Sequence, residues 1–266
     1  MPQVKPKKAL GQHFLTDLSV ARRIAATLDG VDMPVLEIGP GMGVLTRFLL
    51  ESGHDLRVIE IDSESVSYLH REFPDLDGHI IEGDFLQLDL REVFGGKEFA
   101  LIGNYPYNIS SQIFFRVLDY KDLIPVCSGM LQREVAERIA APEGARTRGI
   151  LSVLLQAWYD IEYLFTVSEN VFNPPPKVKS GVIRLRRNGV TDLGCDERLF
   201  RTVVKTTFGQ RRKTIRNSLR SLLPPGAAMP ETDMLAMRPE QLSVAQFIEL
   251  TNLLSSARAA NNPEKS

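Results

Sequence analysis

The sequence of 266 residues predicts an α/β nucleotide-binding domain followed by a small all-α domain. The first domain is indicated by the apolar run Val35–Ile38, which leads through a glycine-rich loop at residues 39–43 into a helical pattern. Strand and helix patterns then alternate up to residue 187, as they do in parallel-sheet folds. Beyond the linker-like stretch 188–196 only helical patterns follow, which predicts domains at residues 1–190 and 191–266.

The individual elements follow from periodicity and from capping or breaking residues. A helix over residues 18–28 begins after Thr16 or Asp17, either of which can cap it, and ends at Gly30. The helix after the glycine loop ends at Gly53. The remaining patterns predict strands at 56–62, 80–84, 99–104, 124–132, 159–167 and 180–187. They predict further helices of the first domain at 63–73, 110–118, 133–139 and 150–157. Helices of the second domain are predicted at 198–208, 211–222 and 244–254.

Composition excludes several classes of protein. The hydrophobic fraction of 43% and the charged fraction of 24% are typical of a globular domain, and no apolar run approaches the roughly 20 residues of a membrane helix. The basic N-terminus lacks the apolar core of a secretion signal, so we expect a cytoplasmic protein. Neither Cys127 and Cys195 nor the four histidines have metal-ligand spacing, which predicts reduced thiols and no metal site.

Charge is unevenly distributed although the net charge is only −1. Residues 51–98 hold thirteen acids and four basic residues. Two stretches without any acid carry the basic residues Lys177, Lys179, Arg184, Arg186 and Arg187, and Lys205, Arg211, Arg212, Lys213, Arg216 and Arg220. Basic patches in a neutral chain indicate a polyanion partner, with solvated helix faces as the equally weighted alternative.

The glycine loop indicates which nucleotide the first domain binds. Its spacing is G-x-G-x-G, whereas the dinucleotide pattern requires a further glycine at position 44, where this chain has Val44. Together with the preceding Glu37, this spacing favours S-adenosylmethionine over a nicotinamide cofactor. Gly39 and Gly41 would let the backbone approach the ligand where a Cβ would clash. A glycine-rich turn without a ligand is the alternative.

Two acids follow the next strands. Glu60 lies 17 residues beyond Gly43, close to the spacing of about 20 expected for an acid that binds both ribose hydroxyls. A solvated carboxylate at a strand end is its less favoured alternative. Asp84 is a candidate acceptor for an adenine amino group, and a turn or helix-cap aspartate is nearly as good an interpretation.

The stretch 104–107, Asn-Tyr-Pro-Tyr, follows an apolar strand and has the chemistry to bind a flat base with an exocyclic amino group. Asn104 and the carbonyl of Pro106 offer acceptors, and Tyr107 offers an aromatic face. Phe172, just before three prolines at 174–176, is a second aromatic candidate, for which ordinary core packing is equally good.

Several separated motifs now agree, and the chain resembles the ribosomal RNA small-subunit adenine dimethyltransferase family, the kasugamycin-sensitivity methyltransferases of bacteria and their relatives. The matching stretches span residues 7 to about 220. They are GQHFL at 11–15, E-x-GPG-x-G at 37–43, Glu60, GD at 83–84, NYPYNIS at 104–110, MLQ at 130–132, F-x-PPPKV at 172–178 and QRRKTIR at 210–216.

The resemblance implies a class I methyltransferase fold, a mostly parallel seven-stranded sheet whose last strand is antiparallel, with a helical C-terminal domain. It implies S-adenosylmethionine as donor and, as substrate, two adjacent adenosines in the 3′-terminal hairpin loop of 16S rRNA, each dimethylated at N6. The donor contacts that it implies fall on Gln12, His13, Leu15, Gly39, Glu60, Asp84 and Asn104. Asn104, Pro106, Tyr107 and Phe172 would present the adenine, and Lys177, Lys179, Arg211, Arg212, Lys213 and Arg216 would bind RNA.

Three positions depart from the usual family pattern: Tyr105 replaces a leucine, His13 stands where asparagine is also common, and Phe85 replaces a frequent alanine. Two rival functions remain. One is adenine methylation of 23S rRNA, as in macrolide resistance; the other is a non-catalytic RNA assembly factor. We expect a monomer, because the sequence shows no obvious interface.

Overall fold

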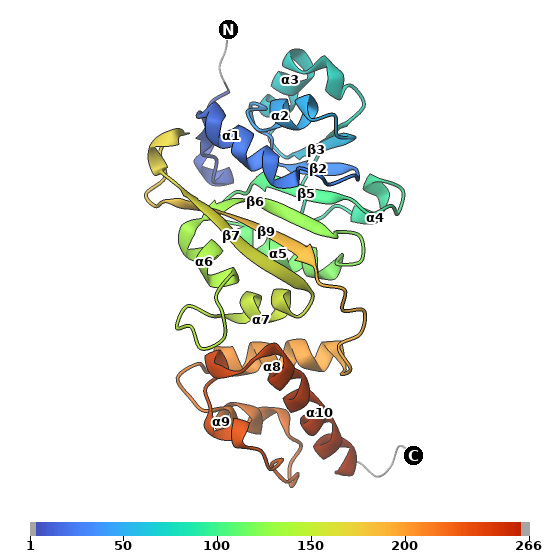
Figure 1. Ribbon diagram of the computed structural model, residues 1–266, viewed down its shortest axis with the longest axis vertical. Coiled ribbons are helices and arrows are strands. Elements are labelled where there is room, and N and C mark those ends of the chain that lie inside the picture. Colours follow the sequence, from blue (N-terminus) through green and yellow to red (C-terminus); the bar gives the residue numbers. More distant parts are fainter. Residues whose placement is uncertain (1–3, 262–266) are drawn as a thin grey trace. The chain divides into compact units, whose positions relative to one another are not determined.

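The computed structural model describes residues 4–261, which form two compact units (Figure 1). The first unit comprises the chain up to Glu137 together with Asp160–Arg187, and the second comprises Arg138–Tyr159 together with the chain from Asn188 onward. The first unit is thus interrupted by a segment that belongs with the C-terminal helices. The domain prediction from sequence had kept that segment in residues 1–190, because linear composition does not show which helices pack together.

The first unit is built on a seven-stranded sheet with the strand order β4-β3-β2-β5-β6-β9-β7. The five strands from β4 to β6 pair in parallel, and β9 runs antiparallel to β6, as the resemblance implied. The strands are β2 (Val35–Ile38), β3 (Leu56–Glu60), β4 (Ile80–Glu82), β5 (Ala100–Asn104), β6 (Val126–Gln132), β7 (Tyr159–Val167) and β9 (Ser180–Arg187).

Helices connect the parallel strands. Asp17 caps α1 by accepting hydrogen bonds from the amides of Ser19 and Val20, and Asp62 caps α3 by accepting one from Glu64. Because Asp62 caps a helix, β3 ends two residues earlier than predicted. The helices are α1 (Leu18–Ala25), α2 (Thr46–Glu51), α3 (Ser63–Glu72), α4 (Leu90–Val93), α5 (Ser110–Asp119) and α6 (Arg133–Ile139), with short 3-10 turns at Lys8–Leu10, Ala26–Leu28, Pro74–Leu76 and Glu169–Val171.

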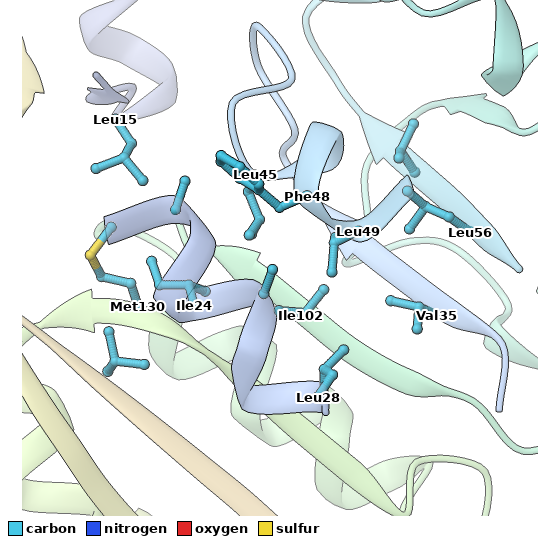
Figure 2. Packing of buried hydrophobic residues seen from close by; sticks show 14 of the residues in the cluster. Leu15, Ile24, Leu28, Val35, Leu45, Phe48, Leu49, Leu56, Ile102 and Met130 are labelled. Carbon is cyan, nitrogen blue, oxygen red and sulfur yellow. The ribbon is translucent and has the colours of Figure 1, made fainter. Parts of the chain in front are cut away.

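Apolar side chains from α1 and the α2 region pack on one face of the sheet (Figure 2). Ile24 from α1 and Leu28 from the 3-10 turn that follows it belong to the same cluster as Ile102 and Val35, and all four are buried. The central strands β2 and β5 are buried on both faces, which is typical of a parallel sheet covered by helices on each side. This core fixes the strand ends that carry the functional residues.

A second, two-stranded ladder was not predicted. β1 (Phe14–Leu15) pairs antiparallel with β8 (Phe172–Asn173), and the register places Leu15 opposite Phe172. Each strand has only two residues, too few for alternation to appear in the sequence. The ladder joins the N-terminal segment to the proline-containing segment, in which the Asn173–Pro174 peptide bond is cis.

The second unit holds α7 (Ile150–Gln156), α8 (Glu197–Gly209), α9 (Ile215–Leu219) and α10 (Val244–Ala260), with 3-10 turns at Arg220–Leu222, Asp233–Ala236 and Pro239–Gln241. The helix predicted for 211–222 is wrong at its start. Residues 211–213 form a turn in which the amide of Lys213 donates to the carbonyl of Gln210 at 2.8 Å. Thr214 is extended, which is the usual conformation of the residue before a helix, so α9 begins only at Ile215.

Candidate active site

A cavity lies at the carboxyl edge of the parallel strands, which is where α/β sheets bind ligands. Its walls come from the N-terminal segment and from the loops after β2, β3, β4 and β5. Ten of the eleven residues predicted to bind the donor or present the base line this one cavity: Gln12, His13, Leu15, Gly39, Gly41, Glu60, Asp84, Asn104, Pro106 and Tyr107.

Glu60 is the last residue of β3, and its carboxylate is held by backbone amides. Oε2 accepts from the amide of Gly41 at 3.0 Å, and Oε1 accepts from those of Ile61 and Asp62, both at 2.9 Å. Burial raises the pKa of Glu60, and the three amide hydrogen bonds oppose that rise. Since a carboxylate has about four acceptor positions and three are used, the Glu60 oxygens keep room for about one further donor.

The glycine loop shapes the neighbouring wall. Gly39 and Gly41 have φ values of +64° and +56°, a left-handed conformation that favours glycine. A Cβ built on Gly39 would meet nothing closer than Pro106 at 4.0 Å, so the missing side chain leaves open space there. A Cβ on Gly41 would instead collide with the ring of Phe14 at 2.9 Å. The loop therefore needs glycine both for its backbone and for close packing.

Glu37, beneath this loop, is a functional candidate that the sequence analysis noted only as part of a motif. Its side chain is 1% exposed, and Oε2 accepts a hydrogen bond from Thr46 Oγ1 at 2.7 Å. Burial, aided by the nearby charge of Glu60, raises the pKa of Glu37 to about 8. Two buried carboxyl groups, those of Glu37 and Glu60, thus line the cavity, and burial raises the pKa of both.

A short N-terminal strap, residues 7–15, closes one side of the cavity. Lys7 Nζ binds the carboxylate of Asp62, and Gln12 Nε2 donates to the same carboxylate at 3.1 Å. Gln12 Oε1 in turn accepts from the amide of Lys7 at 2.8 Å. Burial would raise the pKa of Asp62, but the hydrogen bonds from Lys7 and Gln12 lower it overall. Asp62, which anchors this strap, is not among the site residues predicted from the sequence.

The strap also reaches the Asn-Tyr-Pro-Tyr stretch. Asn104 Nδ2 donates to the carbonyl of His13 at 3.1 Å. The His13 ring packs against the ring of Tyr107 with centroids 5.5 Å apart, and its Nδ1 lies 2.8 Å from the carbonyl oxygen of Pro174. The hydroxyl of Tyr107 is hydrogen-bonded to Ser180 Oγ. His13 therefore orders both the amide and the aromatic ring of the tetrapeptide.

Tyr105, which departs from the family pattern, is 1% exposed and is fixed to β6 twice. Its amide donates to the carbonyl of Met130 at 2.8 Å, and its hydroxyl donates to the carbonyl of Ser128 at 2.6 Å. The ring occupies space next to two glycines: a Cβ on Gly103 would approach it to 3.1 Å, and one on Gly129 to 2.7 Å. The aromatic side chain therefore fits because glycine stands at both neighbouring strand positions.

The surroundings of two predicted site residues, Asp84 and Phe172, include contacts other than those expected of a ligand-binding residue. Asp84 lines the cavity, and its Oδ1 accepts from the amide of Leu86 at 2.9 Å, so it also has the turn role considered from sequence. Phe172 is 4% exposed, belongs to the hydrophobic core and does not line the cavity within the described chain. In the structure the Phe172 ring packs in the hydrophobic core, which is the alternative considered from sequence. Base stacking by this ring stays a prediction.

The predicted RNA-binding side chains lie on both units. Lys177 and Lys179 are exposed between β8 and β9 of the first unit. In the second unit the turn after α8 carries Arg211, Arg212 and Lys213, and α9 carries Arg216; Arg211 is half-buried and the others are exposed. Within residues 4–261 no group of histidine, cysteine or acidic side chains has the arrangement of a metal site, and no helix there is long and apolar enough to cross a membrane.

Solved structures resemble the fold over most of its length. A dimethyladenosine transferase from Plasmodium falciparum aligns with a TM-score of 0.77 at 22% identity, covering 92% of this chain and 98% of that one. The 23S rRNA methyltransferase ErmE aligns with a TM-score of 0.64 at 26% identity, covering 90% of this chain and 99% of that one. The fold is that of a class I S-adenosylmethionine-dependent methyltransferase, as predicted.

Sequence relatives are much more similar. The Ribosomal RNA small subunit methyltransferase A of Parabacteroides distasonis is 68% identical over 255 residues, 94% of each chain. The protein of the same name from Porphyromonas gingivalis is 66% identical over 256 residues, 96% of this chain and 99% of that one. Residues 3–256 match the family described as Ribosomal RNA adenine dimethylase. The chain therefore belongs to the ribosomal RNA adenine dimethylase family, whose members are S-adenosylmethionine-dependent methyltransferases.

Proposed function

We propose that this protein transfers methyl groups from S-adenosylmethionine to N6 of two adjacent adenosines in the 3′-terminal hairpin loop of 16S rRNA, during small-subunit assembly. The products are N6,N6-dimethyladenosines. Relatives named Ribosomal RNA small subunit methyltransferase A, at up to 68% identity, support the choice of ribosomal subunit. The observation that carries the chemistry is the fixed orientation of the Asn104 amide at the cavity wall.

The cavity fits the donor chemically. The space beside Gly39 is open, and the Glu60 oxygens, which within residues 4–261 accept from three backbone amides, suit a ribose hydroxyl. We assign donor binding to Gln12, His13, Leu15, Gly39, Gly41, Glu60, Asp84 and Asn104. The amide of Gln12 is already bonded to Lys7 and Asp62, so it acts by holding the strap in place. When bound, S-adenosylmethionine supplies an electrophilic methyl group on its sulfonium.

Asn104 and Pro106 present the adenine. Because Asn104 Nδ2 is engaged by the carbonyl of His13, its Oδ1 is the atom left to accept an N6 proton. The carbonyl of Pro106 is a second acceptor. Holding both N6 hydrogens turns the nitrogen lone pair out of the ring plane and toward the methyl group, which supports in-line displacement.

Tyr107 provides a stacking face for a base that has left its helix. Its hydroxyl bond to Ser180 and its contact with the His13 ring hold the phenol in one position. The reaction requires no strong base, because the alkylated nitrogen is acidic and loses its proton to water or a nearby carbonyl. For the second transfer the monomethyl product must present its remaining N–H, so the cavity must accommodate one methyl group.

Basic side chains of both units bind phosphates and set the register of the RNA. Lys177 and Lys179 serve this purpose in the first unit. In the second unit the assigned residues are Arg211, Arg212, Lys213 and Arg216. A single protein molecule suffices for this arrangement, and we propose that it acts as a monomer in the cytoplasm.

The nearest alternative is methylation of 23S rRNA, the activity in the name of ErmE, which is 26% identical to this chain. The much higher identity to the small-subunit proteins favours 16S rRNA. The other alternative, a non-catalytic assembly factor, is disfavoured because the glycine loop, Glu60, Asp84 and the Asn-Tyr-Pro-Tyr stretch all converge on one cavity.

The test uses labelled S-adenosylmethionine and small subunits that lack the modification, followed by mapping of the modified nucleotides. We expect two dimethylated adenosines in the 3′-terminal fragment of 16S rRNA. Asn104→Ala should abolish transfer, while Asn170→Ala, which changes an exposed asparagine on the first unit, should not. Methylation of 23S rRNA instead would overturn the substrate, and an Asn104→Ala protein with wild-type rate would overturn the site.

A further inference from the structure

Two basic segments that are far apart in the sequence are joined in the second unit. The loop 141–149 follows α6, and the turn 210–213 follows α8 (Figure 1). The Arg211 guanidinium donates a hydrogen bond to the carbonyl of Arg146. The amide of Gly144 donates to the carbonyl of Glu240 at 2.9 Å, and Arg211 Nε lies 3.6 Å from Glu240 Oε2. The loop is thus fastened to the turn through Arg211 and Glu240.

The loop contains a buried cation that forms no salt bridge within the described residues 4–261. Arg148 is 2% exposed, and its Nε has no hydrogen-bond partner within residues 4–261. Burial lowers the pKa of Arg148, and the carboxylate that opposes this effect, that of the exposed Glu143, acts only through space. An incompletely neutralised buried charge is costly to a folded protein, and an external anion that approaches it reduces that cost.

Exposed cations surround this buried charge. Arg146 is exposed and stands two residues from Arg148, so their Cα atoms are at most about 7 Å apart. The bond between Arg211 and the Arg146 carbonyl brings the turn, with its exposed Arg212 and Lys213, to the same place. Loop 141–149 and turn 210–213 therefore bring together five cationic residues from two separate parts of the sequence, namely Arg146, Arg148, Arg211, Arg212 and Lys213.

We propose that loop 141–149 and turn 210–213 form one phosphate-binding surface for the RNA backbone, with Arg146, Arg212 and Lys213 as its contacts. Arg148 supplies buried positive charge behind it. Arg211 is a positioning residue, because its guanidinium is engaged with Arg146 and Glu240. Neither segment contains an aromatic residue on which a base can stack, and the charge of both is mainly positive, so phosphates are the groups that we expect this surface to bind. The inference rests on the proposed RNA substrate.

The first experiment compares Arg146→Glu with Arg198→Glu, a charge reversal at an exposed arginine on α8 of the same unit. Binding of unmodified small subunits is measured over a series of salt concentrations, beside methyl transfer and calorimetric donor binding. For Arg146→Glu we expect at least tenfold weaker subunit binding, a log–log salt slope shallower by about one, and unchanged donor affinity. Arg198→Glu should behave as wild type. Equal subunit affinity and slope for the two variants would overturn the surface.

The second experiment removes the buried cation by Arg148→Met. If Arg148 were only structural, the variant would melt at a lower temperature than wild type. If the Arg148 guanidinium is instead a poorly compensated charge that serves RNA binding, Arg148→Met should melt at the same temperature as wild type or higher. The variant should nevertheless bind small subunits at least threefold more weakly. A destabilised variant, or a stable one with wild-type affinity, contradicts the proposal.

The two proposals fail in different ways. If wild-type protein binds subunits but methylates neither rRNA, the proposed activity is wrong while the phosphate surface is still measured by binding. If wild-type protein methylates 16S rRNA and Arg146→Glu does so with unchanged KM, the activity stands and the surface is wrong.

Discussion

The amide nitrogen of Asn104 donates a hydrogen bond to the backbone carbonyl of His13, 3.1 Å away on a different segment of the chain. This bond decides which end of the amide faces the cavity, since the nitrogen is used and the oxygen is free to accept. The strap thereby takes part in base recognition although it belongs to the donor side of the cavity. Both ligands of the proposed reaction thus depend on the same short segment.

Replacement of Asn104 by aspartate tests this orientation. The new carboxylate would keep acceptor oxygens but could not donate to the His13 carbonyl, and it would be repelled by that oxygen. We expect Asn104→Asp to lower kcat for methyl transfer by about 100-fold. If aspartate supports more than half the wild-type kcat, acceptance alone is sufficient and the bond to His13 is dispensable.

Tyr105 should contribute to stability through both its hydroxyl and its ring. Tyr105→Phe removes the donor to the Ser128 carbonyl and should cost about 1–2 kcal/mol of unfolding free energy. Tyr105→Leu also leaves space beside Gly103 and Gly129, and should cost about 2–4 kcal/mol. Urea unfolding of the three proteins measures both values. A leucine variant as stable as wild type would show that the site collapses around the smaller side chain.

Glu37 should make stability depend on pH. Its folded-state pKa of about 8 lies above the ordinary value of 4.5, so folding takes up a proton between these values. The unfolding free energy should therefore fall as pH rises from about 5 to 8. Glu37→Gln removes this dependence and should be more stable than wild type at pH 8, by about 2–4 kcal/mol. Urea unfolding of both proteins at pH 5.5 and at pH 8 measures the effect. The prediction is contradicted if the difference in unfolding free energy between Glu37→Gln and wild type is the same at both pH values.

Asp62 should support donor binding without contacting the donor. Asp62→Ala breaks the bonds to Lys7 and Gln12 that hold the strap, and it also removes the cap of α3. We expect donor affinity to fall about tenfold and the unfolding free energy to fall by about 1 kcal/mol. Asp17→Ala, which removes the cap of α1 only, is the matched control and should lose stability with unchanged donor affinity. Calorimetry on both variants separates the two effects.

Much of the fold could be predicted because it is encoded locally. The strand Val35–Ile38, the glycine loop and the position of Glu60 follow from periodicity and spacing. The boundary error at residues 211–213 has a local cause too, since α8 and α9 are separated by a short turn with good helix-forming residues. Propensity alone does not show where one helix ends and the next begins.

The identity of most site residues could be predicted from the sequence, but the contacts between them could not. Asn104 and Glu60 stand at strand ends, and the carboxyl ends of parallel strands meet at one edge of the sheet. The anchoring of the strap by Asp62 joins residues about 50 positions apart, and the position of Phe172 in the core depends on a ladder with Leu15. Such pairings leave no periodic signal in the chain, so a single sequence does not reveal them.

The β1–β8 ladder has a consequence for the newly made protein. One wall of the cavity comes from residues near position 14, but its partner strand is made about 160 residues later, at Phe172–Asn173. While the ribosome is still synthesising α7, the strap has no strand to pair with. Contacts of such long sequence separation form late in folding. The protein therefore completes its donor site only after residue 173 has been made, long after the residues of the strap.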